Sequence, residues 1–182
     1  MILEGAVYIN YIKIIASIII ILSSTGIGMY MGCWYRWEIK QLKEFKKIIM
    51  LLKGEISYGN TALADAIKEI ASKKEGEFSE FLLAVEKGIE EGQGVRFQLI
   101  WENAVEVKLS RISLGLKSKE MIKGLGRELG YMDKHTQIEC LDVFLYELDE
   151  EIKEKTTASK DKTRICNAIG ILLGIFIVII LT

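Results

Sequence analysis

Two long stretches of the chain carry no charged residue, and they constrain its fold more than any other feature. Residues 14–35 form an uncharged run of 22 residues, and residues 165–182 form one of 18. The chain has 24 Lys+Arg and 25 Asp+Glu, so all 49 charged residues lie in the remaining 142 positions. Charged residues make up about a third of that part, above the usual quarter. We therefore expect two segments adapted to lipid and a central segment adapted to water.

The uncharged runs have the length of membrane-spanning helices. A helix of 22 residues is about 33 Å long, which is enough to cross a hydrocarbon core of about 30 Å. The second run is about 27 Å long and is dominated by Ile, Leu, Val and Phe, which favour insertion. The first run lacks the basic region and cleavage site of a signal peptide. The sequence therefore predicts a transmembrane helix within residues 1–35 and another over residues 165–182.

Basic residues predict the orientation of these helices. Residues 36–53 contain six Lys or Arg and residues 150–164 contain five, whereas Lys13 is the only one beyond the two runs. The positive-inside rule places such flanks in the cytoplasm. We therefore expect residues 36–164 to form a cytoplasmic domain, with both termini on the outer side of the membrane.

Small residues suggest that the two spans meet. Gly28 and Gly32 form one G-x-x-x-G motif, and Gly170 and Gly174 form another at a similar distance from the cytoplasmic flank. Such motifs allow close approach of membrane helices. We predict that these four glycines pack the spans together as a hairpin.

The central domain reads as a helical bundle. The chain contains no proline, which favours long uninterrupted helices. Two apolar series follow the 3-4 spacing of a helix seam and predict two long antiparallel helices, the first running to Tyr58–Gly59 and the second capped by Asp133. The members of the series are Leu42, Phe45, Ile49, Leu52 and Ile56, and Ile138, Leu141, Leu145, Leu148 and Ile152.

Shorter helices are expected between these two. Asn60 or Thr61 can cap a helix that carries Leu63, and glycines 92 and 94 end another. Gly130 follows the last apolar position of a further helix and is expected to stop it as a residue beyond its C-terminus. No window alternates like a strand. The predicted fold is all-α, with about six helices flanked by the two transmembrane helices.

The residues of an enzyme are missing from this sequence. It contains no G-x-x-x-x-G-K-[ST] motif, and its one histidine, His135, falls in a solvated helix start. Cys33, Cys140 and Cys166 lack the spacing of a metal or disulfide framework. A net charge of −1 argues against a nucleic-acid partner. We expect no catalytic residue, cofactor, metal, nucleic acid or small-molecule substrate.

The sequence resembles the stage III sporulation protein AB family of endospore-forming bacteria. The matching stretches run from Ser23–Gly28 through Leu51–Gly59 and Leu125–Gly130 to the apolar tail. No single stretch is diagnostic, but their order and spacing are specific. The resemblance implies that seven residues are structural signature positions: Gly59, Leu63, Ala66, Trp101, Gly126, Gly130 and Asp133.

The resemblance also implies a function. Members of the family belong to a channel between mother cell and forespore, and they are similar to the inner-membrane platform protein of type II secretion and type IV pilus machines. The chain is therefore expected to be a scaffold in the mother-cell membrane facing the forespore. Its expected partners are a cytoplasmic secretion-type ATPase, other membrane subunits and the lipid bilayer. The alternative is a membrane-tethered helical adaptor or regulator outside any secretion complex.

Exposure alone suggests where a partner could bind. Tyr58 is expected at the tip of the bundle, and Arg111, Lys117 and Lys119 lie in a basic turn. We take these four residues as the candidate partner interface.

Overall fold

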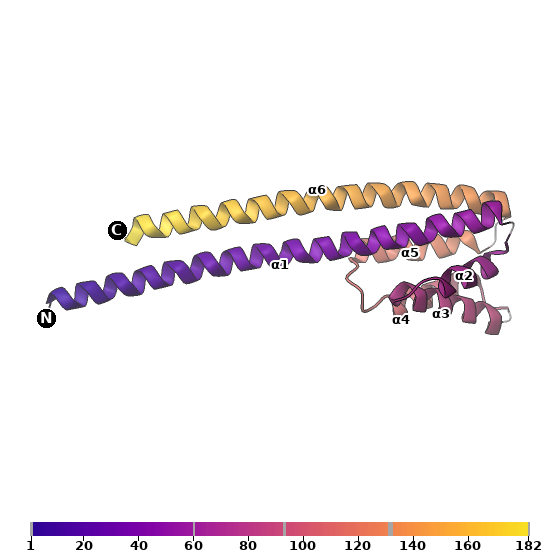
Figure 1. Cartoon of the computed structure of the whole chain (residues 1–182), viewed down its shortest axis with the longest axis horizontal. Coiled ribbons are helices and arrows are strands. Elements are labelled where there is room, and N and C mark those ends of the chain that lie inside the picture. The colour runs from indigo at the N-terminus through magenta and orange to yellow at the C-terminus, as the bar shows by residue number, and fades with distance from the viewer. Residues whose placement is uncertain (1, 60, 93, 131–132, 182) are drawn as a thin grey trace. The chain divides into compact units, whose positions relative to one another are not determined.

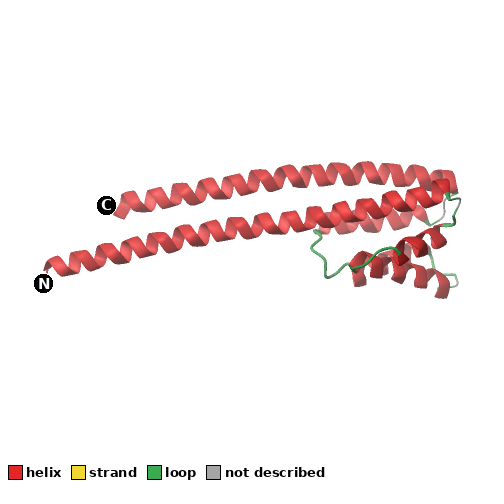
Figure 2. Cartoon of the chain, viewed as in Figure 1, coloured by secondary structure: helices red, strands yellow, loops and turns green. Residues whose placement is uncertain are grey.

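The structure, a computed structural model, describes residues 2–59, 61–92, 94–130 and 133–181. These ranges contain six α-helices and no strand, which confirms the predicted all-α fold (Figures 1 and 2). The helices are α1 (Ile2–Tyr58), α2 (Leu63–Ser72), α3 (Glu77–Glu91), α4 (Phe97–Lys108), α5 (Leu116–Leu129) and α6 (Lys134–Leu181).

The chain divides into two compact units. One comprises residues 1–36 and 155–182, and the other comprises residues 37–154. Helices α1 and α6 pass without interruption from one unit into the other. We call residues 37–154 the bundle.

The transmembrane helices expected at the two ends are not supported. No helix in the described part of the chain is long and apolar enough to cross a membrane. Gly28, Gly32, Gly170 and Gly174 lie outside the residues whose side chains are described, so their packing stays a prediction.

Within the bundle, α1 and α6 are antiparallel, as their apolar series predict. Lys46 Nζ lies 2.6 Å from Asp149 Oδ1, and Lys53 forms an ion pair with Asp142. A later position on α1 therefore pairs with an earlier position on α6, as it does in antiparallel helices. All five α1 seam residues are at most 1% exposed, which confirms that this stripe is core.

The remaining helices form a series of antiparallel neighbours. Helix α2 packs on α3, α3 on α4 and α4 on α5. Phe45 of α1 joins these helices to the long pair, because its ring centroid lies 5.4 Å from that of Phe78 on α3 and 6.1 Å from that of Phe144 on α6. One apolar core therefore spans the bundle.

The helix ends agree with the sequence in part. Asp133 caps α6, since its Oδ1 accepts the N–H groups of His135 at 2.9 Å and Thr136 at 3.2 Å. The predicted cap of α2 at Thr61 is wrong: Ala62 is the N-cap and no side chain caps this helix. Asn60, the other candidate, lies outside the described residues.

Gly130 ends α5 at the predicted place but in another manner. Its φ is −74°, so it is not the left-handed stop residue that glycine usually supplies. A Cβ at this position would lie 2.9 Å from Cβ of Phe97. Glycine is required here because α4 approaches closely.

Candidate functional site

The described residues contain no group of three or more His, Cys, Asp or Glu that could hold a metal ion. The His135 side chain is 83% exposed, and its Nε2 lies 3.3 Å from Glu139 Oε1. Cys140 is buried, and its thiol donates to Glu128 Oε2 over 3.1 Å. Burial, followed by the nearby Glu128 carboxylate, raises the pKa of the Cys140 thiol to about 12, so this cysteine stays protonated and unreactive. The surfaces of the bundle are thus its candidate functional sites.

Trp101 and Gly126 explain much of the sequence signature. The Trp101 side chain is fully buried, and its indole N–H donates to the Ile122 carbonyl over 2.8 Å. Its ring packs edge-on against Phe81 at a centroid distance of 4.9 Å. A Cβ on Gly126 would lie 2.3 Å from the indole carbons, so only glycine allows α5 to pass this close to Trp101. These residues shape the core rather than bind a ligand.

The other signature positions also have structural roles. Ala66 is fully buried, and Leu63 packs against the core from the first turn of α2. A Cβ on Gly59 would lie 2.7 Å from the Glu55 carbonyl oxygen. Together with the Asp133 cap, these contacts place the signature inside the bundle or at its helix ends.

A buried carboxylate that sequence reasoning missed holds the first turn of α5. Glu38 is 0% exposed, and its Oε1 accepts the Gly115 N–H over 2.7 Å and the Ser118 hydroxyl over 3.0 Å. A negative charge suits a helix N-terminus, where the N–H groups and the helix dipole are positive. The signal was present in the sequence: Glu38 precedes Leu42 by four residues and extends the apolar seam by one position.

Lys117, a predicted interface residue, is engaged within the bundle. Its Nζ lies 2.6 Å from Glu151 Oε2 and 3.0 Å from Glu154 Oε2, both on α6. Hydrogen bonds to Glu151 and then Glu154 raise the pKa of Lys117 above its ordinary value. Together with Glu38, this lysine ties the first turn of α5 to both long helices.

The four predicted interface residues do not form one patch. Gly115 is bound to Glu38 near the start of the bundle, whereas Tyr58 lies 20 residues further along α1, about 30 Å away. Tyr58 is 93% exposed at the tip. Arg111 is exposed and Lys119 is half-buried, close to the α5 end of the bundle.

The clearest apolar surface lies along α3 and α4. A groove of about 280 Å³ lies between the two helices, and Ile100 is one of its lining residues. A Cβ on Gly88 would lie 2.4 Å from Ile100 Cγ2, so glycine allows this close approach. Val107, which lines the groove, is 60% exposed, and Leu83 and Leu99 on the same two helices are 46% and 54% exposed. We call this surface the α3–α4 face.

A second groove, of about 380 Å³, lies between α1 and α6. Met50, Leu145 and Tyr146 supply its apolar lining, and the Lys46–Asp149 and Lys53–Asp142 pairs supply its polar lining. Sequence reasoning missed both grooves, because each depends on which helices become neighbours.

Comparisons with known proteins agree with this architecture. The profile of the family described as stage III sporulation protein AB matches residues 13–182. Stage III sporulation protein AB of Bacillus subtilis (strain 168) is 22% identical over 170 residues, which cover 93% of this chain and 99% of that protein. A solved structure of stage III sporulation protein AB shares the fold with a TM-score of 0.61 and 22% identity, over 68% of this chain and 97% of the other. The family match spans nearly the whole chain, which therefore belongs to the stage III sporulation protein AB family, a family of sporulation proteins.

Proposed function

We propose that the chain is a non-enzymatic scaffold subunit of the channel between mother cell and forespore, and that its α3–α4 face docks the secretion-type ATPase of that apparatus. The observation that carries the proposal is the apolar character of this face. Leu83, Leu99 and Val107 are exposed on two neighbouring helices, and Val107 also lines the groove between them. Exposed apolar surface beside a groove is typical of sites of protein association.

The shape of the α3–α4 face also suits a protein partner. Its groove has a floor of small residues, Ala84, Gly88 and Ala104, with Asn103 and Lys108 at the edge. Protein interfaces typically combine such an apolar centre with a polar rim. A side chain of the partner would enter the groove and be fixed by the rim.

Membrane anchoring is part of the same proposal. It rests on the uncharged runs 14–35 and 165–182 and on the basic flanks of both. Large apolar side chains within these runs are at least half exposed, among them Ile19, Leu22, Leu172 and Phe176. Lipid would cover them, with the bundle in the cytoplasm of the mother cell and both termini on the outer side.

Binding of the full chain to the ATPase tests the docking site. Leu83→Glu and Leu99→Glu place charges on the α3–α4 face without touching the core, and together they should weaken binding at least about tenfold, or 1.4 kcal/mol. Leu116→Glu is the matched control, because Leu116 is 84% exposed on α5 and belongs to no proposed contact surface. Unchanged affinity in the double variant would reject this face and leave Tyr58, Arg111, Lys117 and Lys119 as the remaining interface candidates.

A further inference from the structure

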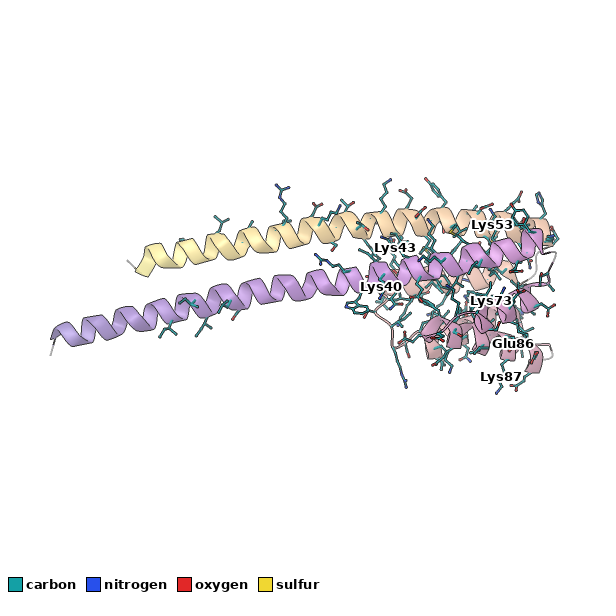
Figure 3. All side chains as sticks on the ribbon, viewed as in Figure 1. Lys40, Lys43, Lys53, Lys73, Glu86 and Lys87 are labelled. Carbon is teal, nitrogen blue, oxygen red and sulfur yellow. The ribbon has the colours of Figure 1, made fainter. Side chains whose placement is uncertain are left out.

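Charge is segregated on the outer face of α1 and α6. Lys40, Lys43 and Lys47 are exposed on α1, and the helical repeat puts them on the side opposite the core positions Leu42 and Phe45. Figure 3 shows Lys40 and Lys43 on this helix. On α6 the corresponding outward positions are acidic. Glu147 and Glu150 are exposed, and Lys153, whose Nζ lies 3.4 Å from Glu150 Oε1, is the exception among them. One helix of the pair is therefore basic and the other acidic.

Large apolar side chains lie where the two charged stripes end. Met50 is 55% exposed and Tyr146 is 70% exposed, and both line the α1–α6 groove. Leu51 on α1 and Val143 on α6 are also about half exposed. Along the face, a part with lysines on α1 and glutamates on α6 is thus followed by an apolar part, a combination that is common in protein interfaces.

The register between α1 and α6 brings these groups to the same level. Because Lys46 pairs with Asp149 and Lys53 with Asp142, Met50 lies level with Tyr146 to within one helical turn. By the same register, Lys47 lies level with Glu147 and Glu150. Lys47 therefore has glutamates at its own height on the neighbouring helix.

This arrangement is complementary to itself. Two copies of a flat face can meet about a two-fold axis that runs parallel to the helices or across them. An axis across the helices places α1 against the partner's α1 and brings lysines together. An axis parallel to the helices places α1 against the partner's α6, and then lysines face glutamates at equal height while the Met50 and Tyr146 side chains meet at the centre. Charge complementarity therefore selects the parallel axis.

The area is sufficient for a weak dimer. Residues 37–58 of α1 span about 33 Å, and two packed helices present a face about 18–20 Å wide. The face would bury about 600 Å² per copy, or about 1,200 Å² in total, which is at the lower limit for a specific interface. The parallel axis also leaves residues 37 and 154 of both copies at the same end of the dimer.

From these observations we infer that the α1–α6 face binds a second copy of this chain as a two-fold symmetric dimer, with the axis parallel to the helices. This surface is separate from the α3–α4 face, so the dimer leaves the proposed docking site open on both copies.

Charge reversal tests the dimer with the full chain in detergent, using sedimentation equilibrium. Lys47→Glu and Glu150→Lys should each raise the dimer dissociation constant about tenfold or more, because each change acts at two symmetric contacts. The double variant should restore association, since lysine and glutamate then face each other again. Lys87→Glu on α3, where the lysine side chain is 69% exposed, is the control and should change nothing.

Crosslinking tests the direction of the axis. Two tagged chains without native cysteines, one with Lys47→Cys and the other with Glu150→Cys, are mixed and treated with a short bis-maleimide. The expected product joins the two different chains. A product that joins two Lys47→Cys chains would reject the parallel axis, and a chain that stays monomeric at tens of micromolar would reject the dimer. Association that ignores both charge reversals would also overturn it, because other segments would then be responsible.

Discussion

Helix α5 is held in two chemically different ways, by shape in its middle and by charge in its first turn. At Gly126 the helix lies so close to Trp101 that no Cβ fits between them. At Gly115 and Ser118 the helix start is bound by the buried Glu38 carboxylate. The apolar contact tolerates no added atom, whereas the polar contact requires one particular group. The comparison shows that one helix can be positioned by packing at one point and by hydrogen bonding at another.

The shape-based contact should be the more costly to lose. Trp101→Ala removes a fully buried indole, and we expect the free energy of unfolding to fall by about 3–5 kcal/mol. Thermal unfolding of the full chain in detergent, followed by circular dichroism, measures the change. Trp37→Ala is the control, because Trp37 is 56% exposed and its ring lies 5.0 Å from the Lys40 ammonium. A similar loss in both variants would contradict the central role of Trp101.

The close approach at Gly126 can be tested separately from the indole. Gly126→Ala forces the ring or the helix to shift, at a cost of about 1–3 kcal/mol. Gly124→Ala is the matched control on the same helix, because a Cβ there meets only Arg127 Nη2 at 3.7 Å. Since alanine favours a helix over glycine by up to about 1 kcal/mol, the control should be neutral or stabilising. The Tm should therefore fall in Gly126→Ala and stay unchanged or rise in Gly124→Ala.

The long helices and the α5 contacts differ in how far sequence predicts them. The repeated 3-4 spacing of apolar residues and the absence of proline were enough to predict α1 and α6 within the bundle. The need for Gly126 could not be predicted, because it depends on a tryptophan 25 positions earlier that meets it only in the folded chain. The resemblance to the family marked Trp101 and Gly126 as structural positions but did not explain why they are needed.

Charged residues were the main source of error for the candidate site. Charge usually indicates a solvated position, so the sequence predicted neither the burial of Glu38 nor the binding of Lys117 to another helix of the same chain. That Lys117 belongs to a partner interface stays a prediction. In the structure Glu38 is buried and Lys117 binds Glu151 and Glu154. The exposure of Leu83, Leu99 and Val107 could not be predicted from the sequence, because it depends on which helices cover them.

The polar contact at the start of α5 should be the next most costly to lose. Glu38→Ala leaves the Gly115 N–H and the Ser118 hydroxyl without this acceptor, so the free energy of unfolding should fall by about 1–3 kcal/mol. Glu38→Gln keeps an acceptor oxygen and loses only the charge, and its effect should be smaller. Thermal unfolding ranks the variants, and Glu139→Gln, at an exposed position, should match the wild type. Equal losses in the alanine and glutamine variants would show that charge, not hydrogen bonding, holds this turn.

A polar contact at the other end of α5 should have the smallest effect. The Asp133 carboxylate caps α6, and the Gln137 side chain donates to the Leu129 carbonyl at the end of α5 over 3.1 Å. Asp133→Ala should lower the Tm by only a few degrees, because Asp133 is exposed and Gln137 still binds α5. Asp133→Asn keeps a capping oxygen and should have little effect near neutral pH.

At acidic pH, the stability of the wild type should differ from that of the Asp133→Asn variant. The Thr136 hydroxyl, which donates to Oδ2 over 2.8 Å, and then the Thr136 N–H hold the pKa of Asp133 below its ordinary value. A carboxyl whose pKa is lower in the folded chain contributes stability that is complete above its unfolded pKa of about 4. That contribution is lost as the pH falls through the folded value. The Tm of the wild type should therefore fall relative to that of Asp133→Asn as the pH drops below about 4. A constant difference between the two Tm values across this range would show that the cap acts through hydrogen bonding alone.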